Sequence, residues 1–260
     1  MMKEKLSPAT ISHNLATSFI GKKVIYYPQI ASTMKAARGE ALRGDAEGTV
    51  VIADEQTAGR GRLERGWLSP EGCIALSIVL YPELKHLSSL IMVASLAVVN
   101  AVDTVTGLQP QVKWPNDVLI GDKKVCGILV ESGIRDKNTH YAVVGIGINV
   151  NIDAGCLKDL VVPATSLSAE MGKEVSRLEM VRRLLVEFEW LYLLAKEGDA
   201  VYRQWRDRLV TLGKRVTARC GEKVYEGTAE AVDGDGSLLL RQSGGNTVRI
   251  AAGDVTLQQP

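Results

Sequence analysis

The chain has 260 residues, of which 46% are hydrophobic and 23% charged, and its formal net charge is +1. This composition is ordinary for a globular protein with a substantial core and excludes an intrinsically disordered chain. The balanced charge gives no general attraction to nucleic acid or to anionic membranes, so any anion binding must come from local clusters. The length predicts one large domain or two unequal domains.

The cysteine and histidine content argues against a metal or disulfide framework. The four cysteines are far apart, form no Cys-x-x-Cys pair and, with the three scattered histidines, show no spacing suited to zinc. No secretory signal is recognisable at the N-terminus, so reduced core thiols in a cytoplasmic protein are expected. The most apolar run, residues 90–102, is too short to span a bilayer and predicts a buried helix.

The first residues predict one short helix. Ser7 and Pro8 supply an N-cap and a first helical residue, and apolar side chains follow at helical spacing at Ile11, Leu15 and Phe19. Two helices would need more chain than residues 1–20 provide, so a helix-turn-helix is not expected there.

The body of the chain, residues 21–211, alternates strands and helices. Ser32 or Thr33 caps a helix that runs to about residue 42, and the Ser176-x-x-Glu179 capping box opens another that runs to about residue 196. A third, mostly apolar helix is expected at residues 87–105. Strands are expected at residues 24–27, 49–53, 73–81, 118–120, 125–131 and 141–151, with a further one opened by residue 112.

After about residue 212 the pattern changes to short strands separated by glycine-rich turns, at residues 215–220, 224–232, 237–241 and 247–251. Closely spaced hairpins of this kind predict a small β-barrel over residues 212–260. The chain as a whole is therefore expected to be α+β, with a large sheet-and-helix domain followed by a small barrel.

One loop, residues 56–67, is a candidate anion-binding site. Residues 56–67 contain three arginines and three glycines within Gly59-Arg60-Gly61-Arg62-Leu63-Glu64-Arg65-Gly66, followed by Trp67. Arginines of this density do not enter a core, and glycine disfavours a helix. Guanidinium groups match phosphate and carboxylate in a bidentate manner, and glycines let backbone N–H groups approach an anion. On composition alone, a solvated loop remains equally consistent.

Three other clusters also lie at the ends of expected strands, where ligand sites collect. They are Ser32-Thr33, the segment Lys113-Trp114-Pro115-Asn116-Asp117 with Lys124, and the segment from Gly145 to Asn151. Together they offer positive charge, hydrogen-bonding groups for a small polar head and a tryptophan ring. Each cluster could also have a purely structural role. Ser32-Thr33 could be a helix cap, Trp114-Pro115 a packed kink, and Lys124 a solvated charge in a hairpin.

These segments resemble the signatures of biotin protein ligases, in that family's order and approximate spacing. The resemblance rests on Gly59-Arg60-Gly61-Arg62-x-x-Arg65-x-Trp67, Lys113-Trp114-Pro115-Asn116-Asp117, Lys124-x-x-Gly127-Ile128-Leu129-Val130-Glu131, Gly145-Ile146-Gly147-Ile148-Asn149-Val150, Ala31-Ser32-Thr33 and Pro163-Ala164-Thr165-Ser166-Leu167. It implies the biotin–lipoate ligase fold, which is like that of class II synthetases, with a mixed or antiparallel sheet and a C-terminal SH3-like barrel.

The resemblance also implies a two-step reaction. Biotin and ATP, with Mg²⁺, give biotinyl-5′-AMP and pyrophosphate, and the biotinyl group then passes to a lysine of a biotin carboxyl carrier domain, as in acetyl-CoA carboxylase. It implies a monomer or homodimer. Because no DNA-binding domain is recognisable in the sequence, a monofunctional ligase that does not repress transcription is expected.

By the same resemblance, residues take the following roles. Lys124, Arg60, Arg62 and Asp117 are expected to be catalytic, with Asp117 a candidate Mg²⁺ ligand. The residues expected at biotin are Ser32, Thr33, Met34, Gln56, Gly59, Arg60, Gly61, Arg62, Lys124, Gly127 and Gly147. Those expected at ATP or the adenylate are Arg60, Arg62, Arg65, Trp67, Asn116, Lys124 and Asn149.

Two positions depart from the family pattern: Glu64 stands where glycine is usual, and Met34 where asparagine is usual. Glu64 is expected to change the loop if that position needs a positive φ, and Met34 leaves only its backbone N–H for biotin. Two other functions remain open. A lipoate ligase shares the fold and the adenylation strategy, and a biotin sensor would bind without catalysis.

Overall fold

The computed structural model describes residues 5–136, 139–157 and 162–257. Its centre is a seven-stranded sheet in the order β1-β2-β3-β7-β6-β5-β4. β1 and β2 are parallel, and the remaining neighbours are antiparallel. The strands are β1 Val24–Ile30, β2 Val50–Gln56, β3 Ile74–Leu80, β4 Gln111–Lys113, β5 Asp117–Ile120, β6 Lys123–Asp136 and β7 Thr139–Ile148. This mixed sheet with flanking helices confirms the predicted fold class.

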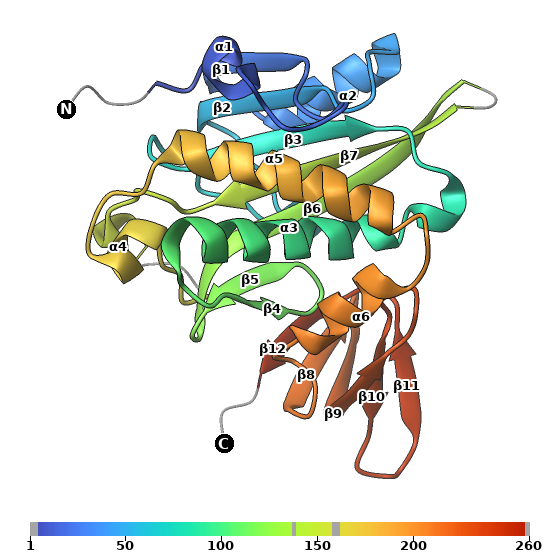
Figure 1. Ribbon diagram of the computed structural model, residues 1–260. Coiled ribbons are helices and arrows are strands. Elements are labelled where there is room, and N and C mark those ends of the chain that lie inside the picture. Colours follow the sequence, from blue (N-terminus) through green and yellow to red (C-terminus); the bar gives the residue numbers. More distant parts are fainter. Residues whose placement is uncertain (1–4, 137–138, 158–161, 258–260) are drawn as a thin grey trace.

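The two faces of the sheet are covered differently (Figure 1). Helices α3 (Ser89–Thr106) and α5 (Arg177–Leu194) pack on one face, and α2 (Thr33–Arg43) packs on part of the other. The alternation of side chains along a strand produces this division, because Val51 joins the cluster under α2 while Ile52 joins the core under α3. The part of the sheet that α2 leaves uncovered carries the candidate site.

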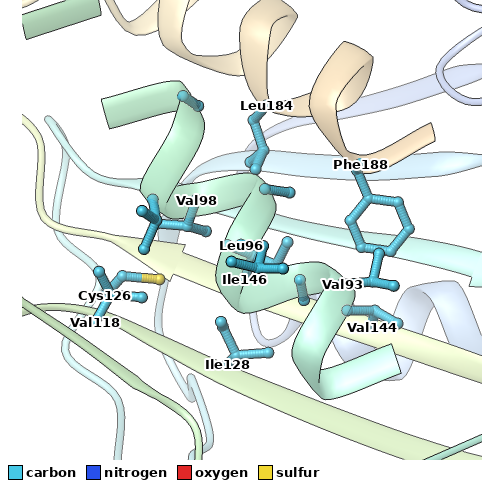
Figure 2. Close-up of a cluster of buried hydrophobic side chains, with 14 of the residues drawn as sticks. Val93, Leu96, Val98, Val118, Cys126, Ile128, Val144, Ile146, Leu184 and Phe188 are labelled. Atoms are coloured by element: carbon cyan, nitrogen blue, oxygen red, sulfur yellow. The ribbon is translucent and has the colours of Figure 1, made fainter. Parts of the chain in front are cut away.

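The main core lies between the sheet and its two long helices. Figure 2 shows Leu184 and Phe188 of α5 facing Val93 and Leu96 of α3, with strand residues Ile128, Val144 and Ile146 on the other side of α3. Within the described residues, α3 is long and apolar enough to cross a membrane by length and composition. Because α3 is packed between sheet and helix, it is a core helix, as its sequence predicts.

The N-terminal helix is present but shorter than its apolar spacing suggests. α1 spans Pro8–Ser12, and Ser7 forms a capping box with Thr10. The helix ends there because His13 is extended and Asn14 adopts a left-handed conformation with φ 49°. The following segment is fixed by another device: the Glu189 carboxylate accepts the N–H groups of residues 18, 19 and 20 at 2.5, 2.9 and 2.8 Å.

A five-stranded antiparallel sheet, in the order β11-β10-β9-β8-β12, forms the C-terminal unit. Its strands are β8 Arg215–Cys220, β9 Lys223–Val232, β10 Leu238–Arg241, β11 Thr247–Ile250 and β12 Asp254–Leu257. The sequence did not predict β12, or the helices α4 Leu167–Met171 and α6 Ala200–Asp207, or the 3-10 turns η1 Arg62–Glu64, η2 Leu84–His86 and η3 Ala154–Leu157. The division into residues 21–211 and 212–260 stays a prediction.

Trp114 joins the two units. Its indole donates to the Gly236 carbonyl at 2.8 Å, and its backbone N–H donates to Thr211 Oγ1 at 2.9 Å. The side chain is only 2% exposed. The segment that follows, Pro115 to Asp117, is therefore held between the central sheet and the C-terminal unit, close to the candidate site.

Candidate active site

The floor of the site is a pair of opposed glycines. Gly127 of β6 and Gly147 of β7 are direct cross-strand partners, and their neighbours Ile128 and Ile146 are buried in the core under α3. A Cβ on Gly147 would lie 2.4 Å from Trp67 Nε1, and one on Gly127 would lie 2.9 Å from Trp67 Cζ3. The bare positions therefore let the indole ring lie directly against the sheet, which explains the alternation of glycine and isoleucine.

A cavity of about 440 Å³ extends from this floor, a size that suits a small-molecule site. All but one of the residues predicted to bind biotin or ATP line the cavity, and so does the predicted catalytic Asp117; they are Ser32, Thr33, Met34, Gln56, Arg60, Gly61, Arg62, Arg65, Trp67, Asn116, Asp117, Lys124, Gly127, Gly147 and Asn149. The exception is Gly59, whose carbonyl accepts the Trp67 N–H at 2.9 Å and so closes the base of the loop.

One end of the cavity is built for a polar head group. Gln56 Oε1 accepts the backbone N–H of Thr33 at 2.8 Å and its hydroxyl at 3.1 Å, and Ser77 Oγ lies 2.9 Å from the same hydroxyl. Ser32 is the N-cap of α2. These contacts hold the hydrogen-bonding groups at the start of α2 in place before a ligand arrives. Met34 closes this end, and a Cβ on Gly145 would lie 2.5 Å from its sulfur.

The arginine loop is ordered and hairpin-like. Arg60 and Gly66 form an isolated antiparallel bridge, and the Gly61 N–H donates to the Arg65 carbonyl at 2.8 Å. The left-handed residue here is Leu63, with φ 52°. The side chain of Glu64, the departure from the family pattern, lies outside the described residues.

The arginines of the loop point at partners from two distant segments. Arg62 Nη1 donates to Asn116 Oδ1 at 3.2 Å, while Asn116 Nδ2 donates to the Ile128 carbonyl at 2.7 Å. Arg62 also lies 3.9 Å from Asp254, and Arg65 forms an ion pair with the same carboxylate. Burial lowers the pKa of Arg62, an effect that Asp117 opposes and Arg65 adds to.

Asp254 is the residue that sequence reasoning missed. It opens β12 in the C-terminal unit, more than 180 positions after the loop, and lines the cavity. The alternation in Asp254-Val255-Thr256-Leu257 was a weak signal for a strand. Nothing local to this segment marks it as part of a site, because only the packing of the C-terminal unit brings it to the arginines.

Lys124 occupies the centre of the charged end. Its ammonium lies 2.5 Å from Asp117 Oδ1 and 5.4 Å from the centroid of the Trp67 ring, where a cation is attracted by the π face. Its backbone is fixed as well: the Lys124 N–H donates to the Pro163 carbonyl at 2.8 Å, and its carbonyl accepts the Thr165 N–H at 2.9 Å. Lys124 is thus held through its side chain by Asp117 and through its backbone by the segment from Pro163 to Thr165.

The segment that fixes Lys124 is itself anchored by buried polar contacts. Asn149 is 3% exposed, and its side-chain amide donates to the Thr165 carbonyl at 3.0 Å. The Thr165 hydroxyl donates to Glu170 at 2.6 Å, and Lys123 pairs with the same carboxylate. In the structure Asn149 therefore orders the wall of the cavity, in addition to lining it.

The donor set does not form a dedicated metal cage. Within the described residues no group of three or more His, Cys, Asp or Glu side chains is placed to hold an ion. Mg²⁺ commonly binds proteins through one or two carboxylates together with substrate phosphates and waters. The carboxylates that line the cavity, Asp117 and Asp254, fit that mode of binding.

The comparisons with known proteins agree with this architecture. The biotin protein ligase from Aquifex aeolicus in complex with biotin and ATP is similar over 92% of this chain and 100% of that chain, with a TM-score of 0.79 and 31% identity. The fold is therefore that of the biotin protein ligases: a mixed sheet with flanking helices, followed by a C-terminal β unit. Residues 26–149 match the biotin/lipoate A/B protein ligase family, and residues 211–257 match the biotin protein ligase C terminal domain.

Curated relatives lead to the same assignment. The biotin–[acetyl-CoA-carboxylase] ligase of Paracoccus denitrificans is 37% identical over 85% of this chain and 94% of its own length. The bifunctional ligase/repressor BirA of Bacillus spizizenii is 36% identical over 97% of this chain and 79% of its own length. The chain belongs to the biotin protein ligase family.

Proposed function

We propose that this protein activates biotin with ATP to biotinyl-5′-AMP and transfers the biotinyl group to a lysine of a biotin carboxyl carrier domain, such as that of acetyl-CoA carboxylase. The observation that carries the proposal is the continuity of the cavity. It leads from the hydrogen-bonding groups at Thr33 and Gln56, across the floor formed by Gly127 and Gly147, to the positive charge of Lys124 and the arginine loop.

The first step joins two anions. A biotin carboxylate oxygen attacks the α-phosphorus of ATP, the bond from that phosphorus to the bridging oxygen breaks, and the electron pair leaves on pyrophosphate. Neutralising the charge on these groups is the main catalytic task, and preorganised cations perform it without reorganisation. Lys124 and Arg62 are suited to it because each is held in place by hydrogen bonds or ion pairs at 2.5 and 3.2 Å.

The roles proposed for the remaining residues come from the family resemblance, and the cavity lining supports them. Ser32, Thr33, Gln56 and the Met34 backbone bind the ureido ring of biotin, and Gly61 and the two floor glycines admit its apolar part. Arg60, Arg62 and Arg65 contact the adenylate phosphate, with Trp67, Asn116 and Asn149 at the nucleotide. Gly59 acts through the base of the loop. Asp117 would be the protein ligand of Mg²⁺ carried by ATP, and the ion would supply neutralisation of phosphate charge.

The loop of residues 56–67 serves as a lid. Closing it over biotinyl-5′-AMP protects a mixed anhydride from water while the acceptor lysine approaches. The loop is already partly ordered by the Arg60–Gly66 bridge and by Asp254. Trypsin cleavage at Arg60, Arg62 and Arg65 should therefore slow when biotin and ATP are both present, and unchanged cleavage would contradict the lid.

The decisive experiment is transfer of radiolabelled biotin to a purified carrier domain with Mg·ATP. Wild-type protein should label the acceptor, and Lys124→Ala should lose adenylate formation and hence labelling. Absence of labelling by the wild type would favour a non-catalytic biotin sensor. Pyrophosphate release driven by lipoate in place of biotin would identify a lipoate ligase. That the protein binds no operator DNA stays a prediction, testable by a gel-shift assay.

A further inference from the structure

Lys113 is a further cation beside the charged end of the site, next to the residues that line the cavity, and none of the roles proposed above uses it. It is the last residue of β4, the edge strand of the central sheet, and its side chain is half-buried. Within the described part of the chain, no carboxylate lies within ion-pair distance of it. A half-buried ammonium without a close counter-ion is unfavourable in a folded protein unless something else compensates.

The register of the sheet fixes the direction in which Lys113 points. Lys113 is paired with Asp117 across β4 and β5, Asp117 with Gly127 across β5 and β6, and Gly127 with Gly147 across β6 and β7. Direct cross-strand partners project to the same face of a sheet. The row therefore runs from the glycine floor through Asp117 to Lys113 on one face of the sheet, with Lys113 next to Asp117, which lines the cavity.

Among the side chains that the structure describes, the charges at this end do not balance. Arg62, Arg65, Lys113 and Lys124 gather around two carboxylates, Asp117 and Asp254. Asp117 is already engaged by Lys124 at 2.5 Å, so Lys113 shares that carboxylate only at longer range. Burial lowers the pKa of Lys113, Asp117 raises it, and Lys124 and Arg65 lower it further. The cluster has an excess of positive charge that an anion would neutralise.

We propose that Lys113 contacts the β-phosphate of ATP and holds the leaving pyrophosphate at the β4 edge of the sheet. This role rests on the proposed adenylation reaction. Lys124 and Arg62 surround the α-phosphate end, and Lys113 on β4 lies two strands from Gly127 on β6, about 10 Å away at the usual strand spacing. When the bond between the α-phosphorus and the bridging oxygen breaks, the negative charge develops on the β-phosphate, beside the Lys113 ammonium.

This placement separates the two half-reactions. Pyrophosphate leaves in the first step, whereas AMP leaves when biotin passes from the adenylate to the acceptor lysine. Loss of the Lys113 charge should therefore impair adenylate formation and its reversal by pyrophosphate, and leave transfer from preformed biotinyl-5′-AMP unchanged. A residue needed only for folding or for loop order would impair both steps.

The test compares Lys113→Met and Lys113→Gln, which remove the charge, with Lys113→Arg, which keeps it, and with Lys214→Met as an exposed control. Biotin-dependent exchange of pyrophosphate into ATP should show a KM for pyrophosphate raised about tenfold or more in both neutral variants, the effect of losing one charge-assisted contact. The arginine variant should recover most of this loss. Transfer from purified biotinyl-5′-AMP should stay within about twofold of wild type in all variants.

A binding measurement supplies a readout that does not depend on turnover. Calorimetric titration of inorganic pyrophosphate should show weaker binding to both neutral variants than to the wild type and the Lys214→Met control. A KM for pyrophosphate and an affinity that are both unchanged in the neutral variants would overturn the role of Lys113. A wild-type protein without biotin-dependent exchange would overturn the proposed adenylation instead, and the pyrophosphate titration would still report on Lys113.

Discussion

The contact between Trp67 and the glycine floor gives a quantitative prediction for Gly147→Ala. The added Cβ would lie 2.4 Å from Trp67 Nε1, and ordinary van der Waals contact begins at 3.4 Å, so the indole must move by about 1 Å. Overpacking of this size typically costs about 1–3 kcal/mol. Because Trp67 forms a wall of the cavity, we expect biotin affinity to fall by a factor of roughly 5–150.

Calorimetric titration of biotin measures this loss, and a double-mutant cycle identifies its origin. If the methyl group acts by displacing the indole, Gly147→Ala should have little further effect in a Trp67→Ala background, a coupling of at least about 1 kcal/mol. Gly244→Ala is the matched control, because a Cβ there meets nothing within 4 Å. Equal losses in both backgrounds would refute the reasoning and would show that the methyl group obstructs biotin itself.

Three other substitutions test the scaffold of the site. Glu189→Gln replaces a carboxylate that accepts three backbone N–H groups with a side chain that has one acceptor oxygen, so the free energy of unfolding should fall by about 2–4 kcal/mol in urea titrations. The hydrogen bond to Asp54, with burial, raises the pKa of Tyr26 from 10.0 to about 12. The contribution of this hydrogen bond to the free energy of unfolding is therefore complete below pH 10 and is lost as the pH rises to about 12. The Tyr26→Phe variant should not show this loss. Asp254→Asn removes the ion pair with Arg65, and because such partly exposed pairs contribute at most about 1 kcal/mol, trypsin cleavage of the loop should accelerate by up to about fivefold.

Each of these has a clear contrary outcome. Glu197→Gln, at an exposed position after α5, is the control for Glu189, and an equal effect of both would contradict the clamp on the N-terminal segment. Parallel stability curves of wild type and Tyr26→Phe between pH 9 and pH 12 would contradict the Tyr26 assignment. A cleavage rate of the loop that is unchanged in Asp254→Asn would show that Asp254 does not restrain it.

Local signals located the elements and most of the cavity lining. Ser176 caps α5 and Ser32 caps α2, as predicted, because a cap depends on residues only three positions apart. The glycine–isoleucine alternation around Gly147 marked a strand open to close approach, which proved to be by the Trp67 indole. One local signal was misleading. The helical spacing of apolar residues continues to Phe19, but the chain leaves the helix at His13.

The sequence by itself determined every strand but β12, the capped helices α2 and α5 and the clusters that resemble the biotin protein ligase signatures, because periodicity, caps and motif order are properties of neighbouring residues. Only the tertiary structure decided that Asp254 pairs with Arg65 of the arginine loop, that Trp114 lies between the two units, and that Lys113 projects from the same face of the sheet as the glycine floor. These relations depend on strand order and on the docking of the C-terminal sheet. Sequence patterns do not encode such relations locally, because the residues involved meet only after distant segments have packed together.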